Sequence, residues 1–172
     1  MTEGITAGLE LIRLPIDQAF WQAILKTEGV REKLSGDSRV LLIGTDPDLT
    51  LAKQILATYP QAQITIVERN QKIVEAVQKK VPDQVKLIAG DFLGLEESVL
   101  PKASLVAAKH LIHFPGVDLK AIVGRATAIG EQFFASVPPV VHFLVDRNLH
   151  KNGIEFRKTS LGQAGEMYCF KS

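Results

Sequence analysis

Short apolar segments alternate with helical patterns along most of this chain, and this alternation constrains the fold more than any other feature. Each apolar segment has the length of a strand, and each is followed by apolar residues at helical spacing. Strict alternation is typical of a parallel sheet with helices on both faces. The strands are expected at 39–44, 63–69, 85–91, 103–112 and 131–137, and the helices at 48–59, 71–81, 117–130 and 138–153.

Two of the expected helices have side chains that can cap their first turn. Asp48 begins the 48–59 helix, and Asn70 directly precedes the 71–81 helix. Aspartate and asparagine are favoured at this position because a side-chain oxygen can accept from an unpaired backbone N–H group. We therefore predict Asp48 and Asn70 as N-caps.

The two ends of the chain do not follow the alternation. Residues 16–34 are predicted to form one helix before the first strand, with Trp21 packed against the sheet. Near the other end, two strand-like segments at 154–161 and 166–172 are too close for a crossover helix, so we expect an antiparallel pair. The chain is thus divided into an N-terminal helical segment, 1–38, and a Rossmann-like domain, 39–172.

Composition limits the partners and the compartment. The 172 residues carry a formal net charge of +1, so no long-range field argues for nucleic acid or for a membrane surface. The single cysteine, Cys169, excludes an internal disulfide and suits a reducing compartment. The first residues make a poor signal peptide, and we expect a cytoplasmic protein. No His, Cys, Asp or Glu cluster has metal-ligand spacing, so no metal is expected.

The expected sheet selects the candidate functional residues. In open parallel sheets, ligands bind at the carboxyl ends of the strands, near the point where strand order reverses. Functional side chains are therefore expected directly after each strand. The segments in that position are Gly44–Asp48, Glu68–Asn70, Gly90–Leu93, Lys109–Phe114 and Ser136–Pro139.

These strand ends, together with the two-stranded ending, resemble the class I S-adenosylmethionine-dependent methyltransferases over about residues 16–172. Residues 89–118, AGDFLGLEESVLPKASLVAAKHLIHFPGVD, are similar to the small-molecule O-methyltransferases, which have Gly-Asp-Phe at the third strand and Lys-x-x-x-His at the fourth. The resemblance implies an α/β fold: a Rossmann-like three-layer sandwich whose seven-stranded sheet is mostly parallel, with an antiparallel C-terminal strand. It also implies S-adenosylmethionine as cofactor and a small-molecule acceptor.

The resemblance assigns roles to individual residues. Gly44 and Asp46 stand in the glycine-rich turn at the methionine end of the cofactor. Glu68 corresponds to the residue that binds the ribose hydroxyls, and Asp91 and Phe92 to those at the adenine edge and face. The lysine that matches Lys109 contributes to the cofactor pocket, and the histidine that matches His113 is the general base.

Each role has a plainer alternative that the residues leave open. Glu68 could be a surface side chain paired with Arg69, and Asp91 could cap a helix over 92–100. His113 could be a packed or capping histidine, and an ordinary imidazole is also a usable base near neutral pH. His110 is expected in the pocket wall or the core.

The first turn departs from the family pattern. Gly44 is kept, but Asp46 and Asp48 replace the second and third glycines, and Leu42 replaces an acidic residue of the first strand. Aspartate tolerates left-handed backbone, so the turn could keep its path. Its carboxylates would either repel the carboxylate of the cofactor or attract its ammonium or sulfonium. A plain turn with a helix cap is the alternative for residues 46–48.

The sequence leaves two functions open, one catalytic and one non-catalytic. One is a methyltransferase that uses S-adenosylmethionine on a small hydroxylated or aromatic acceptor. The other is a non-catalytic protein that keeps the methyltransferase fold as a binding or assembly module, which the altered turn favours. A nicotinamide-dependent enzyme is disfavoured because no G-x-G-x-x-G follows the first strand.

The O-methyltransferases cover their substrate with a large N-terminal dimerisation region. Here about 38 residues precede the first strand, so a homodimer is one way to cover the cleft.

Overall fold

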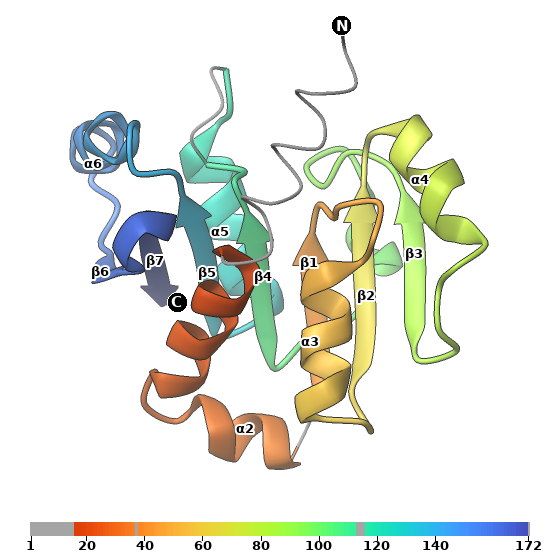
Figure 1. The fold of residues 1–172 in the computed structure, drawn as a ribbon. Helices are drawn as coiled ribbons and strands as arrows, with labels where there is room; N and C mark the ends of the chain where they lie inside the picture. Colours follow the sequence, from red (N-terminus) through yellow and green to blue (C-terminus); the bar gives the residue numbers. More distant parts are fainter. Residues whose placement is uncertain (1–15, 37, 113–115, 172) are drawn as a thin grey trace, which may run out of the picture.

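Seven strands form one sheet in the computed structural model, which describes residues 16–36, 38–112 and 116–171 (Figure 1). The strand order is β3-β2-β1-β4-β5-β7-β6. The strands are β1 (Arg39–Ile43), β2 (Gln63–Glu68), β3 (Val85–Ala89), β4 (Leu105–Lys109), β5 (Gln132–Val137), β6 (Arg157–Ser160) and β7 (Glu166–Lys171).

The pairing confirms the predicted α/β class and the mostly parallel sheet. β1 pairs in parallel with β2 and β4, and the parallel order continues to β3 on one side and β5 on the other. β7 is antiparallel to both β5 and β6 and lies between them. The order of the strands reverses at β1, where the chain goes first to β2 and later to β4. A crevice is expected at such a point.

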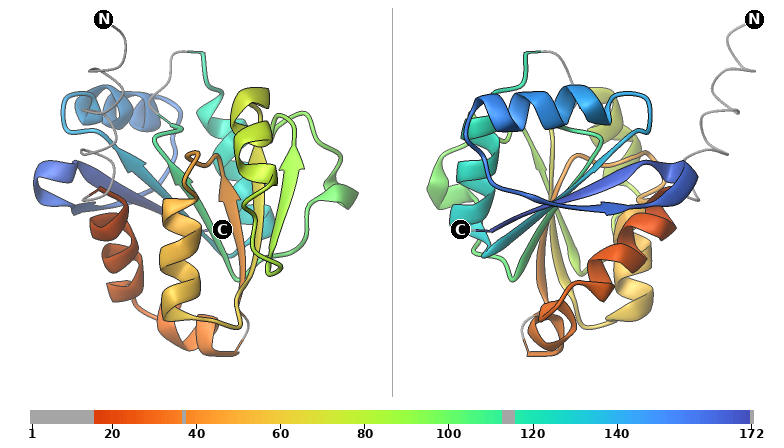
Figure 2. Two further views of the ribbon diagram at one scale, coloured as in Figure 1. Left: turned by 45° about the vertical axis from the view of Figure 1, so that its right-hand side comes forward. Right: turned by 90° about the vertical axis from the view of Figure 1, so that its left-hand side faces the viewer.

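Helices cover both faces of the sheet (Figure 2). The helix over residues 16–26, α2 (Val30–Gly36), α3 (Thr50–Thr58) and α4 (Gln71–Gln78) contribute to the core on one face. The other face is covered by α5 (Leu119–Ile129) and α6 (His142–Lys151). Neighbouring residues of a strand point to opposite faces, so Phe133 of β5 is buried under α5 while Phe134 packs on the other side. The three-layer sandwich is thus confirmed.

The helical segment before the sheet differs from its prediction. Residues 16–34 form two helices rather than one, and they separate at Gly29, whose φ of +79° lies in the left-handed region that glycine enters most easily. Trp21 is buried as predicted. Its Nε1 donates to Thr58 Oγ1 over 3.0 Å, and its ring meets Tyr59 edge-on. This contact binds the first helix to α3.

Several boundaries are shorter than the patterns predict. The apolar pattern over 103–112 continues beyond β4 because Ile112 is buried in the core although it is not in a strand. The helix expected from residue 138 begins at His142, since the two prolines before it lie in a turn. Asn70 caps α4 as predicted, with Oδ1 accepting from Lys72 N over 3.0 Å.

A buried tyrosine joins the C-terminal strands to α6. The Tyr168 hydroxyl donates to Asp146 Oδ1 over 2.6 Å, and Lys158 Nζ lies 2.6 Å from the other oxygen of that carboxylate. Burial raises the pKa of Tyr168, and the Asp146 carboxylate raises it further. The hydroxyl therefore stays protonated and serves as a donor.

We expect Tyr168→Phe to lower the free energy of unfolding by about 1–2 kcal/mol, since the ring is kept while Asp146 loses a donor. Urea unfolding measures this loss. Tyr59→Phe is the matched control, because the Tyr59 hydroxyl has no hydrogen-bond partner among the described residues. Equal urea midpoints for the two variants would show that the hydroxyl does not stabilise the fold.

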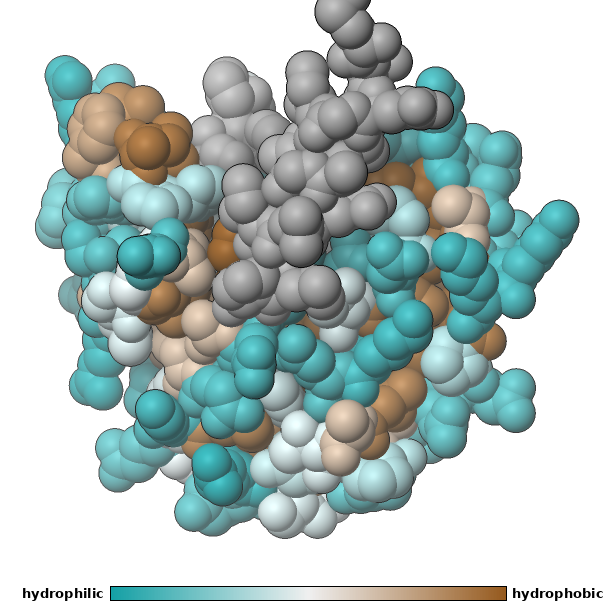
Figure 3. Space-filling model, in the orientation of Figure 1, coloured by the Kyte–Doolittle hydropathy of each residue, from teal (hydrophilic) through white to brown (hydrophobic). Residues whose placement is uncertain are grey.

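Exposed apolar side chains gather at one place among the described residues. Val140, Phe143 and Leu144 are exposed around the start of α6, and Figure 3 shows the apolar colour over this helix.

Within the described ranges, none of the helices combines the length and the hydropathy needed to cross a membrane.

Candidate functional site

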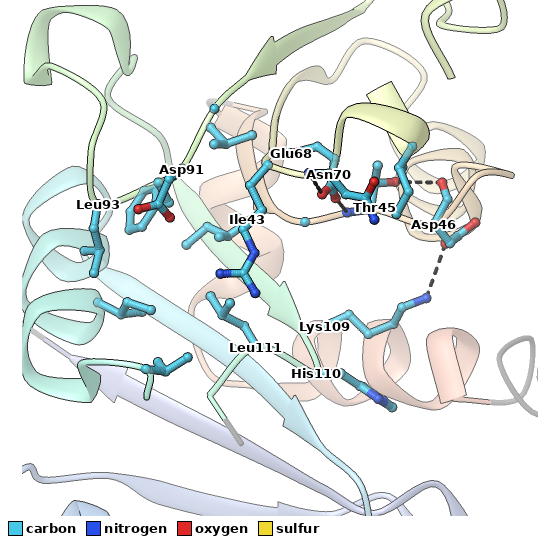
Figure 4. A pocket seen from close by; sticks show the side chains of 18 of the residues that line it. Ile43, Thr45, Asp46, Glu68, Asn70, Asp91, Leu93, Lys109, His110 and Leu111 are labelled. Atoms are coloured by element: carbon cyan, nitrogen blue, oxygen red, sulfur yellow. Dashed lines mark hydrogen bonds and ion pairs between the residues drawn. The ribbon is translucent and has the colours of Figure 1, made fainter. Parts of the chain in front are cut away.

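A pocket of about 590 Å³ lies at the carboxyl ends of β1, β2, β3 and β4. The start of α5 and residue 16 complete its wall. Glu68, Asn70 and Thr45 gather on one side of the cavity, and Asp91 and Leu93 lie across from them (Figure 4). The six residues expected to hold a cofactor all line this one pocket: Gly44, Asp46, Glu68, Asp91, Phe92 and Lys109.

Gly44 turns the chain at the end of β1. Its φ is +83°, a value that residues with a side chain rarely adopt. Its backbone N–H donates to Val67 O over 2.8 Å, so the turn continues the pairing of β1 with β2. A Cβ at this position would lie 3.9 Å from Glu68 Oε2, which is an ordinary van der Waals contact. Glycine is therefore favoured here by the backbone conformation, and not by a lack of space.

The Asp46 side chain accepts hydrogen bonds from other residues of the same turn. Its carboxylate accepts from Asp48 N over 2.9 Å and from the Thr50 hydroxyl over 3.0 Å, and it lies 3.3 Å from Thr50 N. The side chain is buried although it borders the pocket. The prediction that Asp48 caps α3 is therefore wrong: the N-cap position is Leu49, and the first N–H group of the helix, that of Thr50, lies against Asp46.

The two aspartates also do not need the left-handed backbone that glycine would provide. The positive φ in this turn, beyond Gly44, falls on Leu49 at +56°. Leu49 is buried in the core, so packing of its side chain holds this backbone in place. The Asp48 side chain points outward, is 65% exposed and lies 3.9 Å from Lys80. Asp48 is not part of the pocket wall.

Glu68 at the end of β2 is held by two backbone groups. Oε2 accepts from Thr45 N over 2.9 Å, and Oε1 accepts from Asn70 N over 2.7 Å. The residue is buried, with 6% of its surface exposed. A carboxylate has about four lone-pair positions, so these two bonds leave room for two further donors. The alternative of a surface glutamate paired with Arg69 is therefore wrong.

Asp91 and Phe92 follow β3 and differ in exposure. Phe92 is buried, and the Arg125 guanidinium lies 5.3 Å from the centre of its ring. The Asp91 side chain is exposed at the pocket. Its backbone carbonyl accepts from Gly94 N and Leu95 N, which closes a tight turn. The helix expected over 92–100 does not form, so Asp91 is not its cap.

Lys109 ends β4 between two carboxylates. Its Nζ lies 2.8 Å from the Asp17 carboxylate and 3.2 Å from Asp46 Oδ2. The Asp17 side chain is fully buried, and the side chains of Lys109 and Asp46 are 14% and 7% exposed. Asp17 comes from the helix over residues 16–26, so this charge cluster joins that helix to the turn after β1.

The remaining candidates divide into three cases. His110 lines the pocket, as expected, with a φ of +57°. His113, the predicted base, lies outside the described residues. Ser136–Pro139 does not line the pocket: Ser136 is buried, and its carbonyl accepts from His110 N over 3.1 Å.

Among the described residues, no group of three or more His, Cys, Asp or Glu side chains is placed to hold a metal.

Residues outside the strand ends also contribute to the pocket wall. Ile16 and the first turns of α5 also line the pocket. The amphipathic pattern of residues 16–34 could have indicated that one side chain would face the sheet edge. The pairing of Asp17 with Lys109 joins residues 92 positions apart, and no local pattern announces such a contact.

The ionisation of Asp46 makes a testable contribution to stability. Burial tends to raise the pKa of this carboxyl, but Lys109 and the bonds from Thr50 outweigh it and hold the pKa below the usual 3.8. A group whose pKa is lowered by folding stabilises the fold above its unfolded pKa and loses this contribution as the pH falls through the folded pKa. We expect the wild type to lose stability more steeply than Asp46→Asn between about pH 5 and pH 3.

Chemical unfolding at several pH values checks this expectation. Asp48→Asn is the control, because its exposed carboxylate is expected to leave the acid limb unchanged. Parallel acid limbs for the wild type and Asp46→Asn would contradict the assigned ion pair.

Solved structures of other proteins share the architecture of this chain. No protein-family model and no curated protein sequence matches the chain. Human N-acetylserotonin methyltransferase in complex with SAM aligns with a TM-score of 0.65 and 15% identity, over 91% of this chain and 51% of that chain. The chain therefore spans about half the length of that protein.

Two further structures agree over nearly the whole chain. The structure of PigF with SAH aligns with a TM-score of 0.63 and 14% identity, over 92% of this chain and 61% of that one. A methyltransferase from Methanococcus maripaludis, assigned as S-adenosylmethionine-dependent, aligns with a TM-score of 0.62 and 12% identity, over 95% and 86%. Likeness at these identities establishes the fold, and the chain has the Rossmann-like fold of the class I S-adenosylmethionine-dependent methyltransferases.

Proposed function

We propose that this chain binds S-adenosylmethionine in the pocket and catalyses methyl transfer to a small hydroxylated or aromatic acceptor. The observation that carries the proposal is the convergence of four strand ends on one cavity of about 590 Å³. These ends bring together a glycine with positive φ, a buried carboxylate with free lone pairs, an exposed carboxylate and an aromatic ring. The fold and the neighbours named above support the same cofactor.

In this proposal, the side chains that line the pocket serve different parts of the cofactor. Glu68 is held by two backbone N–H groups, which leaves its other lone pairs for a pair of ribose hydroxyls. Asp91 can accept from the adenine amino group, and Phe92 offers an apolar contact to the ring. Gly44 and Asp46, which also line the pocket, would border the methionine end.

The cofactor would supply an electrophilic methyl group on a sulfonium. The chain has to hold the acceptor hydroxyl in line with that group and to remove its proton, and positioning supplies most of the acceleration in such reactions. The part of the wall formed by Leu111, Val117 and Ile122 is apolar and suits an apolar or aromatic acceptor. His113 is the proposed base, on the ground of its match to the family histidine.

The alternative of a non-catalytic module requires that the altered turn spoils the site. The Asp46 carboxylate is bonded to its own turn and to Lys109, and Asp48 lies outside the pocket wall. Neither side chain closes the cavity, so the geometry favours a site that still accepts ligand.

Calorimetric titration with S-adenosylmethionine tests the proposal. We expect micromolar binding, and we expect Asp91→Ala to weaken it about tenfold through loss of a hydrogen bond to a charged acceptor. Asp83→Ala is the control, since Asp83 is also exposed but lies before β3, away from the pocket. An absence of heat at millimolar cofactor would overturn the proposal and leave the module.

A further inference from the structure

The loop of residues 91–95, here called the β3 loop, forms one wall of the pocket. Residues 91–93 line the cavity, and the loop contains no helix or strand (Figure 4). Within the loop, the Asp91 carbonyl accepts from Gly94 N over 2.9 Å and from Leu95 N over 3.1 Å. A segment without regular secondary structure needs contacts from elsewhere to keep its side chains in one place.

Arg125 contacts the β3 loop from α5 without lining the pocket itself. Its Nη1 donates to Leu93 O over 2.8 Å, and its Nη2 donates to Leu95 O. The centre of the same guanidinium lies 5.3 Å from the centre of the Phe92 ring. Hydrogen bonds from a charged donor are stronger than neutral ones, and a guanidinium over an aromatic face adds cation–π attraction. One side chain thus binds the loop at three residues.

The direction of the Asp91 carboxylate depends on the backbone of this loop. The side chain is exposed, and among the described residues the carboxylate has no hydrogen-bond partner. No contact of its own therefore fixes the carboxylate, whereas Arg125 fixes the backbone two and four positions further along.

We infer that Arg125 is a positioning residue, which fixes the β3 loop and thereby keeps the Asp91 carboxylate where it can recognise adenine. This inference rests on the proposed function, in which Asp91 accepts from the adenine amino group. A loop that has to be ordered on binding lowers the affinity by the fraction of molecules that already have the binding conformation. Arg125 keeps that fraction high.

A fixed carboxylate also affects which base the site accepts. The strength of a hydrogen bond falls steeply when its direction departs from the optimum. A carboxylate that stays in one place therefore favours a base with an amino group at the matching position. Arg125 is expected to increase the selectivity for adenine although it does not line the pocket.

Amide hydrogen exchange in the ligand-free protein tests the effect on the loop. Arg125→Met removes the guanidinium and keeps an unbranched side chain. We expect the amides of Gly94 and Leu95 to exchange about tenfold faster in this variant, because local opening breaks their bonds to the Asp91 carbonyl. The amide of Ile66, in the middle of β2, is the internal reference and is expected to exchange at the wild-type rate.

Paired calorimetric titrations test the selection of adenine. The two ligands are S-adenosylhomocysteine and its analogue with hydrogen in place of the adenine amino group. The measured quantity is the dissociation constant of the analogue divided by that of S-adenosylhomocysteine. We expect a ratio of about 10 for the wild type, from one hydrogen bond to a charged acceptor. For Arg125→Met we expect a ratio of about 2, since the carboxylate then occupies its place in fewer molecules.

Two further variants distinguish positioning from charge and from overall stability. Lys120→Met removes the same charge from an exposed position of α5 and is expected to leave the ratio unchanged. Arg125→Lys keeps the charge, but one ammonium replaces the planar fork that reaches two carbonyls. We expect an intermediate ratio for it, and it carries the test if Arg125→Met does not fold. A variant that only loosens the whole pocket would weaken both ligands equally and leave the ratio unaltered.

A double-mutant cycle shows whether Arg125 acts through Asp91. In Asp91→Ala the ratio is expected to be about 1, because no carboxylate remains to accept from the amino group. Adding Arg125→Met to Asp91→Ala is then expected to leave the ratio where it is.

The possible results separate this inference from the proposed function. A ratio in Arg125→Met equal to that of the wild type overturns the inference and leaves the proposed function standing, even if the loop amides exchange faster. Unchanged exchange at Gly94 and Leu95 overturns it too. Binding of neither ligand to the wild type at millimolar concentration overturns the proposed function, and the inference with it.

Discussion

Replacing Lys109 by methionine is expected to lower the free energy of unfolding by about 3–5 kcal/mol, because it removes the ammonium group that contacts two buried carboxylates. Asp17 is fully buried and Asp46 nearly so, and Lys109 Nζ lies within 3.2 Å of both. Methionine keeps much of the length of the side chain but supplies no charge. Urea unfolding followed by circular dichroism measures the loss.

A double-mutant cycle distinguishes the charge from the packing of the lysine stem. Adding Asp17→Asn to Lys109→Met removes one of the stranded charges, and we expect it to restore part of the lost stability. In a background that keeps Lys109, Asp17→Asn alone is expected to destabilise. If Lys109→Met unfolds at the wild-type urea concentration, the three residues do not form the buried cluster described above.

Replacing Glu68 by glutamine is expected to weaken S-adenosylmethionine about 50–100-fold, since hydrogen bonds to a charged acceptor contribute about 1.5–3 kcal/mol. The carboxylate accepts from Thr45 N and Asn70 N and has lone pairs left for the ribose hydroxyls. A carboxamide nitrogen donates and cannot accept, so it opposes one of these backbone N–H groups. Calorimetric titration at fixed pH gives the dissociation constant.

Glu75→Gln is the matched control for Glu68→Gln. Glu75 lies on α4 close to Glu68 in sequence, is exposed, and accepts from Gln71 across one turn of the helix. The same change of charge there is expected to leave cofactor affinity unchanged. Equal weakening by both variants would mean that overall charge, and not a bond from Glu68, governs binding.

Much of the fold and the location of the site could be predicted because both depend on local patterns and one topological rule. Alternation of strand and helix patterns defines the parallel sheet, and the short spacing before residue 166 identifies the antiparallel ending. The rule that ligands bind at carboxyl strand ends then selects Gly44, Glu68 and Asp91, and these residues line one pocket.

The parts that could not be predicted depend on contacts between distant segments. The pattern of residues 16–34 does not reveal that Asp17 contacts Lys109 at the carboxyl end of β4. Asp48 has the better position for a cap in the sequence, but its side chain is exposed, and the carboxylate beside the first N–H group of α3 is that of Asp46, which Lys109 also contacts. Because Lys109 contacts Asp17 as well as Asp46, it joins the helix over residues 16–26 to the turn beside the site.

A second cavity offers an internal comparison for the location of the binding site. It has a volume of about 560 Å³ and lies at the amino ends of β1, β4 and β5, where Lys33, Arg39 and Lys102 contribute to its wall. Strand amino ends are not the usual ligand edge of a parallel sheet. Binding at that cavity would therefore contradict the assignment made from topology.

Backbone amide shifts measured by nuclear magnetic resonance during titration with S-adenosylmethionine decide between the two edges. We expect the largest changes at the amides of Gly44, Glu68, Asp91 and Phe92, with one common dissociation constant. Shifts confined to the cavity around Lys33 and Lys102, or no shifts at millimolar ligand, would contradict the account.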